Sequence, residues 1–303
     1  MSDTRPLRIG VHTPLHHSTI DTLRAVWTRV DELPFDWISV WDHFRPVDGD
    51  GDNFDAVVAH AALAACTSRV QVGCLVYCVG YRTPALLASA ATAIDHVSAG
   101  RAVIGLGAGY LESEYLAYGY DFEPPPTRVD RLASTFTSVR ALLDGERVTR
   151  HDQFVHLDDA TTRPLPQQRH LPMWIGGGGE RRTLPLAGRV ADGWNIPMAT
   201  VADFTRKNDI VTESAERCGR NPGEIERSVN LGLCWNDDDL PERFGPRWEQ
   251  LRPSILGGSA DRVLDQLDAY RRAGADRVML SLRPPLLLDD IERFASDVLP
   301  SLR

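Results

Sequence analysis

Four consecutive glycines, Gly176, Gly177, Gly178 and Gly179, lie between an apolar segment and a segment with helical spacing. Glycine within a strand or helix costs about 1 kcal/mol relative to alanine, so this run requires a tight turn or a group lying directly against the backbone. Bare N–H groups can surround an anion, and the start of a helix adds partial positive charge. We expect that helix to begin near residue 180, with Arg181 in its first turn as a donor to phosphate. The run predicts a cofactor-phosphate cradle, with an unliganded tight turn as the alternative.

Asp42 and His43 stand together at the end of an expected strand over residues 37–43. Adjacent strand residues point to opposite sides, so one of the two faces the end of the sheet while the other anchors the following loop. Histidine is the side chain that most often exchanges protons near neutral pH. His43 is therefore the candidate acid–base catalyst, with a purely structural histidine as the alternative.

A second glycine cluster, Gly105, Gly107 and Gly109, follows the pattern GxGxG in mid-chain. A dinucleotide-binding fingerprint has the pattern GxGxxG in an early βαβ unit, with an acidic residue about 20 positions later, so that assignment is disfavoured. These glycines instead predict a thinned strand end across which a flat ring can lie. Close packing of a helix on the strand is the alternative.

Metal and serine-nucleophile chemistry find no support in the sequence. His12, His16 and His17 match no standard zinc spacing, and neither HExxH nor GxSxG occurs. We therefore expect no metal site. Four residues near expected strand ends are candidates to line a substrate pocket: His12, Tyr77, Tyr110 and Trp235.

Short β-rich apolar runs alternate with longer segments of helical spacing along the whole chain, which is typical of a parallel sheet. Eight strands are expected, over residues 7–13, 37–43, 70–78, 101–109, 172–178, 192–198, 227–235 and 276–282. Eight βα units in about 300 residues predict an α/β fold of the (β/α)8 TIM-barrel class, as a single domain over residues 1–303. An open doubly wound sheet is the alternative. In a barrel, the candidate residues above would meet where the strands end.

Composition narrows the classes of partner and location. The net charge of −9 argues against binding to nucleic acid or to an anionic membrane, and no apolar run approaches the roughly 18 residues of a membrane span. Five cysteines occur without a CxxC pair, and the N-terminus lacks an apolar signal core, so we expect a cytoplasmic protein with reduced thiols. Lys207 is the only lysine among the 33 basic residues.

As a set, these residues resemble the bacterial luciferase-like monooxygenase superfamily, in its coenzyme F420-dependent oxidoreductase branch. The resemblance covers residues 7–282, and its strongest segments are YRTPALLASAATAIDHVSAGRAVIGLGAGYLESEYLAYG and PMWIGGGGERRTLPLAGRVADGWN. It implies a luciferase-like (β/α)8 barrel, usually a homodimer, that binds FMN or the deazaflavin coenzyme F420 across the carboxyl ends of its strands.

The resemblance also implies roles for individual residues. Asp42 and His43 match the pair that contacts the deazaflavin ring, and a non-prolyl cis peptide behind the ring is placed at Leu75–Val76. The four glycines match the phosphate-binding turn. The implied cofactor-binding set further includes Cys78, Gly107, Gly109, Ser113 and Arg181.

One departure bears on the substrate. Sugar-phosphate dehydrogenases of the branch carry a glutamate just after the strand-four glycines, where this chain has Tyr110, so a sugar substrate is disfavoured. The arginine-rich composition is typical of GC-rich genomes, in which F420 is common, and this favours F420 over FMN. The hypothesis is hydride transfer between F420 and a small organic substrate, with His43 moving the accompanying proton. The main alternative is an FMN-dependent luciferase-like monooxygenase that uses oxygen. A flavin-binding barrel without turnover and a metal-dependent hydrolase barrel are further alternatives.

Overall fold

The computed structural model describes residues 6–47 and 49–302, so residues 1–5, 48 and 303 of the expected domain lie outside the described part. Eight parallel strands close into a barrel, since β8 pairs with β9 at the end of the strand order β9-β11-β1-β2-β3-β4-β7-β8. The strands are β1 (Arg8–His12), β2 (Trp37–Val40), β3 (Gln71–Cys78), β4 (Ala102–Gly107), β7 (Met173–Gly176), β8 (Gly193–Pro197), β9 (Glu226–Leu233) and β11 (Arg277–Ser281). The predicted TIM barrel is confirmed, and the open-sheet alternative is wrong.

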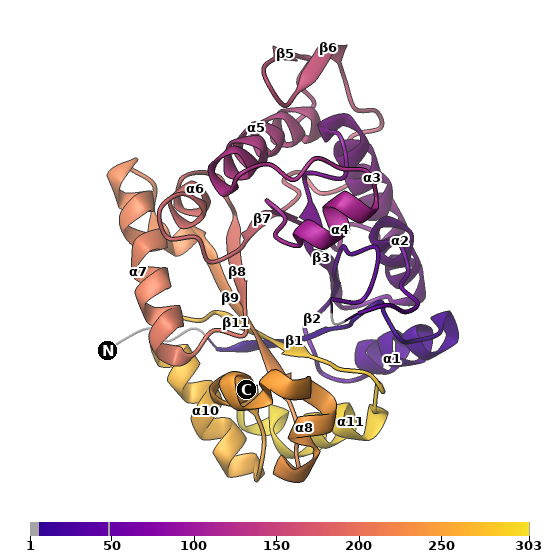
Figure 1. Cartoon of the computed structure of the whole chain (residues 1–303), viewed down its shortest axis with the longest axis vertical. Coiled ribbons are helices and arrows are strands. Elements are labelled where there is room, and N and C mark those ends of the chain that lie inside the picture. Colours follow the sequence, from indigo (N-terminus) through magenta and orange to yellow (C-terminus); the bar gives the residue numbers. More distant parts are fainter. Residues whose placement is uncertain (1–5, 48, 303) are drawn as a thin grey trace.

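The principal helices surround the barrel (Figure 1). They are α1 (Ile20–Glu32), α2 (Ala56–Cys66), α3 (Pro84–Val97), α5 (Pro125–Leu143), α6 (Thr183–Val190), α7 (Val201–Arg217), α10 (Ala260–Arg272) and α11 (Leu288–Asp297). Their starts follow local chemistry: the hydroxyl of Thr19 accepts a hydrogen bond from Thr22 N–H at 3.1 Å, and Pro84 opens α3 behind the N-cap Thr83. Among the described residues, no helix is long and apolar enough to cross a membrane.

Several short elements lie in the loops between strands and helices. They are the hairpin of β5 (Val148–His151) and β6 (His156–Ala160), the helices α4 (Glu112–Ala117), α8 (Leu240–Phe244) and α9 (Trp248–Leu251), and strand β10 (Ile255–Leu256) beside β9. The hairpin projects from the barrel (Figure 1). The helices α4, α8 and α9 and strand β10 were not expected, because elements of two to six residues are too short to show a period.

Large side chains fill the barrel interior below its carboxyl end. Trp37 and Trp174 meet edge to face with ring centroids 4.9 Å apart. The large side chains of the interior pack over glycines. A Cβ on Gly73 would lie 2.7 Å from the Trp37 ring, and one on Gly10 would lie 2.5 Å from the sulfur of Met279. The floor of the barrel is thus a packed core, which leaves open space only toward the carboxyl ends of the strands.

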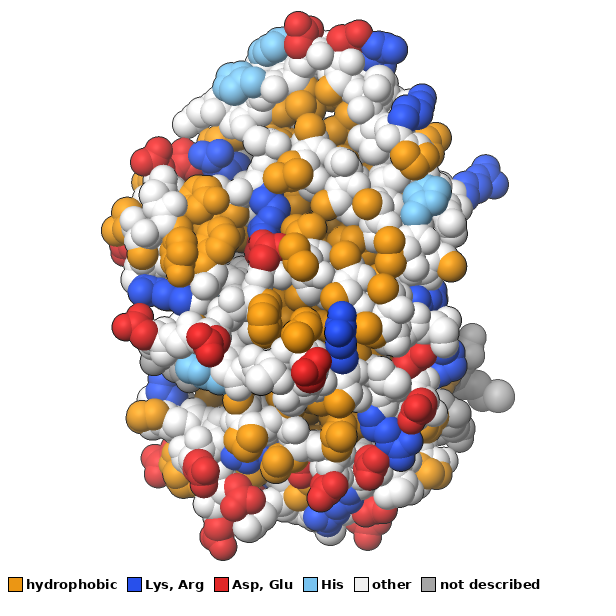
Figure 2. Space-filling view, turned by 90° about the vertical axis from the view of Figure 1, so that its right-hand side faces the viewer, with side chains coloured by type: hydrophobic (Ala, Val, Ile, Leu, Met, Phe, Trp, Pro, Cys, Tyr) orange, Lys and Arg blue, Asp and Glu red, His pale blue; other side chains and the backbone are white. Residues whose placement is uncertain are grey.

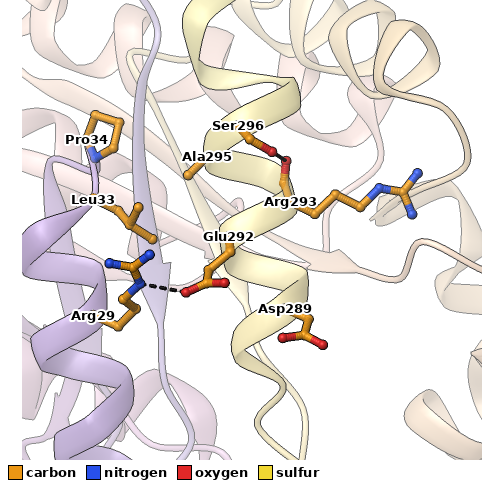
Figure 3. Close-up of a pocket in the computed structure, with 8 residues that line it drawn as sticks. All are labelled: Arg29, Leu33, Pro34, Asp289, Glu292, Arg293, Ala295 and Ser296. Atoms are coloured by element: carbon orange, nitrogen blue, oxygen red, sulfur yellow. Dashed lines mark hydrogen bonds and ion pairs between the residues drawn. The ribbon is translucent and has the colours of Figure 1, made fainter.

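The ring of helices closes where α11 lies beside α1 (Figure 3). Arg29 Nε donates to Glu292 Oε1 at 2.6 Å across this contact. A groove here is also lined by Leu33 and Pro34, which follow α1 and precede β2. This groove therefore opens at the amino ends of the strands, the end of a barrel that carries stability rather than chemistry.

Candidate active site at the carboxyl end of the barrel

A cavity of about 430 Å³ opens where the strands end. It is lined by eleven of the predicted site residues: His12, Asp42, His43, Leu75, Val76, Cys78, Gly107, Gly109, Tyr110, Gly176 and Gly177. The structure thus brings together predicted residues from five βα units, because parallel strands deliver their carboxyl ends to the same edge. Residues outside the predicted set also line it, among them Trp41, Glu114, Asn195, Asn230 and Arg283.

One wall of the cavity is backbone around the side chain of Val76. The Leu75–Val76 peptide is cis, as expected, and the register between β3 and β4 shifts between Cys74 and Tyr77. A Cβ on Gly176 would lie 2.5 Å from Cγ1 of Val76, and one on Gly107 would overlap its other methyl group. Only glycine fits at these two positions, because the side chain of Val76 packs directly against their main chain. The wall is therefore Val76 together with the bare backbone of Gly107 and Gly176.

Asp42 fixes the end of β3 against the loop after β2. Its Oδ2 accepts a hydrogen bond from Cys78 N–H at 2.9 Å and forms an ion pair with Arg82 Nη1. Arg82 Nη2 in turn donates to Asp55 Oδ2 at 2.8 Å. The Asp42 side chain is only 1% exposed, and a buried carboxylate requires a partner, which Arg82 supplies. Asp42 therefore anchors the wall of the cavity.

His43 faces the cavity from the other side and is held by Glu114 of α4. His43 Nδ1 lies 3.0 Å from Glu114 Oε2, which also accepts from the hydroxyl of Tyr81 at 2.6 Å. The other oxygen of Glu114 accepts from Phe44 N–H at 2.6 Å. Burial opposes ionisation of Glu114, but these donors lower the pKa of its carboxyl below the ordinary value. A carboxylate on Nδ1 makes this nitrogen the donor and leaves Nε2 for proton exchange in the cavity.

His12 is the second histidine that lines the cavity. Burial, with the nearby Arg283 and His43, lowers the pKa of His12 to about 3. Its Nδ1 lies 2.8 Å from the hydroxyl of Ser39. His12 is therefore a neutral hydrogen-bonding group at neutral pH, which suits it to binding rather than to carrying charge.

The glycine turn lies at the edge of the cavity. Gly177 has a φ of +130°, which favours glycine, and its carbonyl accepts from the indole of Trp194 at 2.8 Å. Within the described part of the chain, the N–H groups of Gly178 and Gly179 donate no hydrogen bond. They are thus available to an anion.

Lys207 brings positive charge to this turn from α7. Its Nζ donates to the carbonyl of Gly178 at 2.6 Å and lies 3.0 Å from Glu180 Oε1. The one lysine of the chain therefore fixes the predicted phosphate cradle, a role that the sequence analysis did not assign to it.

Some predicted site residues lie away from the cavity lining. Helix α6 begins at Thr183, three residues later than expected, so Arg181 is an exposed residue of the preceding turn rather than part of the first helical turn. Ser113 is exposed on α4 and does not line the cavity. Gly178 and Gly179 lie beyond its edge, in the turn itself.

Two aromatic residues predicted to line the substrate pocket, Tyr77 and Trp235, do not line the cavity, and the prediction was wrong for both. Tyr77 is 2% exposed, and its hydroxyl lies 2.8 Å from Nδ1 of His60 in the layer between β3 and α2. Trp235 donates its indole N–H to the carbonyl of Asp290 at 3.2 Å, against α11. Tyr77 points outward from β3, because strand residues alternate in direction and it lies on the outer side. Trp235 lies two residues beyond the end of β9 and packs against Phe294 of α11.

Glu114 could not be assigned from the sequence because it lies on a six-residue helix in a βα loop. Asn195 and Asn230 form a buried amide pair in the lining of the cavity, with Asn195 Nδ2 donating to Asn230 Oδ1 at 2.8 Å. Each asparagine interrupts an apolar strand, which is the signal that would have marked them.

Comparison with known proteins gives a consistent result. The chain is 30% identical over 282 residues to the F420-dependent glucose-6-phosphate dehydrogenase of Kineococcus radiotolerans, covering 90% of this chain and 82% of that protein. An F420-dependent secondary alcohol dehydrogenase, solved with an F420–acetone adduct, superposes with a TM-score of 0.89 at 19% identity, over 98% of this chain and 99% of that chain. The F420-dependent tetrahydromethanopterin reductase of Methanopyrus kandleri superposes with a TM-score of 0.81 at 18% identity, over 98% and 100%. At these identities the two structures establish the shared fold.

Residues 7–240 match the family model described as luciferase-like monooxygenase. This match spans most of the barrel and includes the glycine wall, His43 and the glycine turn. The chain belongs to the luciferase-like monooxygenase family.

Proposed function

We propose that this protein is an oxidoreductase that transfers hydride between the deazaflavin coenzyme F420 and a small organic substrate. The observation that carries the proposal is the junction of two features: a wall built from Val76 and the bare backbone of Gly107 and Gly176, and a glycine turn whose amides are unengaged. A flat ring requires the first feature and a phosphate requires the second. The F420 dependence of the relative from Kineococcus radiotolerans supports F420 over FMN.

The residues present fit such a cofactor. Asp42, Leu75, Val76, Cys78, Gly107 and Gly109 would hold the ring, and Gly176, Gly177, Gly178 and Gly179 would hold the phosphate. Lys207 adds a cation beside the turn, where Gly178 accepts its hydrogen bond. Neither Gly107 nor Gly176 has room for a Cβ, so even a change to alanine at either position would clash with Val76 in the wall.

When bound, F420 would accept or supply a hydride in a two-electron step. His43 would hold or receive the accompanying proton on Nε2, because Nδ1 is engaged by Glu114. Glu114 is a positioning residue: its negative charge favours the tautomer with the proton on Nδ1 and stabilises the imidazolium that forms. His12 and Tyr110 would contact the substrate, His12 as a neutral hydrogen-bonding group.

The substrate we propose is not a sugar phosphate. Tyr110 occupies the place where sugar-phosphate dehydrogenases of this branch carry a glutamate. Arg283 is the only lysine or arginine among the described residues that line the cavity, and a phosphate monoester is usually held by several cations. A small alcohol or ketone fits the mostly apolar lining better.

Side-by-side titration of one apo sample with F420 and with FMN tests the cofactor. Tight binding of F420 and weak binding of FMN are expected. Hydride transfer is then followed by the absorbance of F420 with a panel of secondary alcohols and ketones. Failure of the sample to bind either cofactor would overturn the proposal, and preferential binding of FMN would redirect it to oxygen chemistry.

We further propose a homodimer of a cytoplasmic enzyme, formed through the outer faces of α2 and α3. Neither outer face carries an Asp, Glu, Lys or Arg side chain, and Val58, Leu86 and Val97 are 69%, 56% and 51% exposed. Figure 2 views the molecule from this side and shows hydrophobic side chains gathered over its middle. A second copy brings an identical uncharged face, which suits an isologous contact.

A further inference from the structure

A groove of about 620 Å³ runs between α6 and α7 on the outer surface of the barrel. The two helices lie side by side (Figure 1), because Gly188 allows close approach. A Cβ on Gly188 would lie 2.5 Å from the carbonyl oxygen of Val211 and 2.8 Å from Cβ of Ser214. The groove is thus a built feature of the helix packing rather than a gap between loops.

Three arginines line this groove: Arg181, Arg189 and Arg217. The side chains of Arg181 and Arg189 make no hydrogen bond or ion pair with any residue that the structure describes. Arg217 donates to the hydroxyl of Ser214 at 3.1 Å and to a backbone carbonyl, which leaves its charge unbalanced. In a chain of net charge −9, this is a locally cationic surface.

The two acidic residues of the groove do not cancel that charge. Glu180 is already paired with Arg206 and with Lys207, whose Nζ lies 3.0 Å from its carboxylate. Glu213 is the other acid in the lining. Three arginines therefore face a single carboxylate that is free of a partner cation, so the groove favours an anionic ligand.

The groove begins where the glycine turn ends. Gly176, Gly177 and Thr183 face the cavity, whereas Glu180 and Arg181 face the groove. A ligand whose phosphate lies on Gly178 and Gly179 would thus have the cavity on one side and the groove on the other. The two sites are separated only by the turn.

We propose that this groove binds the oligo-γ-glutamate tail of F420, an inference that rests on the proposed cofactor. The tail is attached beyond the phosphate and carries one carboxylate for each glutamate, which matches a row of arginines. Helix α6 has eight residues and spans about 12 Å. An extended α-linked peptide covers about 3.5 Å per residue, and a γ-linked one covers more, so a few glutamates reach from the turn to Arg189.

The test compares the Kd of the full-length protein for F420 with a single glutamate and for F420 with a tail of several glutamates. The long tail is expected to bind more tightly, by about two- to fivefold for each arginine engaged, which is the range of an exposed ion pair. This advantage should shrink as salt is raised. The double variant Arg189→Gln/Arg217→Gln should lose it while keeping the Kd for the single-glutamate form.

Arg24→Gln serves as the matched control, because Arg24 is an exposed helical arginine on α1. It should keep the full advantage of the long tail. Equal affinity for both tails in the unchanged protein, or an advantage that survives in the double variant, would overturn the tail site while leaving the cofactor proposal intact. Absence of binding for both forms would instead overturn the cofactor proposal and the tail site with it.

Discussion

His43 Nδ1 lies 3.0 Å from the carboxylate of Glu114, a side chain with no solvent exposure. The two residues are 71 positions apart in the chain, and the contact exists because α4 folds back over the end of β2. A buried carboxylate on one ring nitrogen decides which nitrogen faces the cavity. The pair therefore defines the proton-handling geometry of the site.

Replacing Glu114 with glutamine should lower kcat by about tenfold or more with a much smaller change in KM. The amide retains the shape of the side chain but removes the charge that stabilises the imidazolium. His43→Ala should lose about 10²–10⁴ in kcat, the usual contribution of a general acid or base, while F420 still binds. Steady-state kinetics and F420 titration check both variants. Glu112→Gln, on the exposed side of the same helix, should behave like the unchanged protein. Full turnover in His43→Ala would remove His43 from the mechanism.

Lys207→Met should weaken binding of F420 but not of the deazaflavin nucleoside fragment that lacks the phosphate. The ammonium lies against Gly178 at the predicted phosphate turn, so its loss removes both a cation and a hydrogen bond that fixes the turn. We expect a loss of affinity of about tenfold, the effect of one charge-assisted contact. Fluorescence titration with the two ligands measures the difference. Arg206→Gln on the same helix is the comparison, since Arg206 contacts Glu180 rather than the glycine carbonyl. Equal weakening of both ligands would mean that Lys207 acts through stability alone.

Gly176→Ala should destabilise the protein by about 1–3 kcal/mol, the usual cost of overpacking. The added methyl group would lie 2.5 Å from Cγ1 of Val76, and it would also roughen the wall on which the ring is proposed to rest. Urea denaturation measures the loss of stability. Combining the change with Val76→Ala should recover part of it, because the clashing methyl groups are removed. No recovery in the double variant would place the clash elsewhere.

Stability should fall as pH is lowered from about 6.5 toward 4. Burial lowers the pKa of His60 to about 4 and that of His12 to about 3, whereas an unfolded histidine titrates near 6.5. In this window the unfolded state binds more protons than the folded state, so each histidine contributes a loss of about 1.4 kcal/mol per pH unit. Denaturant midpoints across the window, compared with those of His60→Gln, should show a shallower slope in the variant. The exposed His151→Gln should retain the original slope. An unchanged slope in His60→Gln would contradict a neutral His60.

Introducing charge on the α2–α3 face should yield monomers. Val58→Glu combined with Leu86→Glu would place two carboxylates per copy against an identical face, which is unfavourable in a desolvated contact. Sedimentation velocity should change from dimer to monomer with little change in melting temperature of the barrel. Leu165→Glu, an exposed apolar position outside α2 and α3, should leave the dimer intact. A monomeric unchanged protein would refute the interface.

The sequence alone determined the barrel and the location of its chemistry. Periodicity separates eight strands from their helices. The requirement that parallel strands end at one edge places His43, Gly107 and Gly176 at the same end of the barrel. The glycine runs were informative because consecutive glycines indicate either a tight turn or a group that lies directly against the backbone. The resemblance placed the Leu75–Val76 peptide and the phosphate turn at positions where the structure has a cis bond and unengaged amides.

Tertiary structure alone decided which side chains meet. Period-two alternation does not say which face of a strand end is the inner one, so Tyr77 was assigned to a pocket from which it points away. The partners of His43 and of the glycine turn, Glu114 and Lys207, lie in other units of the barrel, at separations for which a sequence carries no local signal. Packing brings them together because α4 contacts the residues after β2 and α7 contacts the turn after β7. These contacts depend on the whole ring of strands rather than on any one segment.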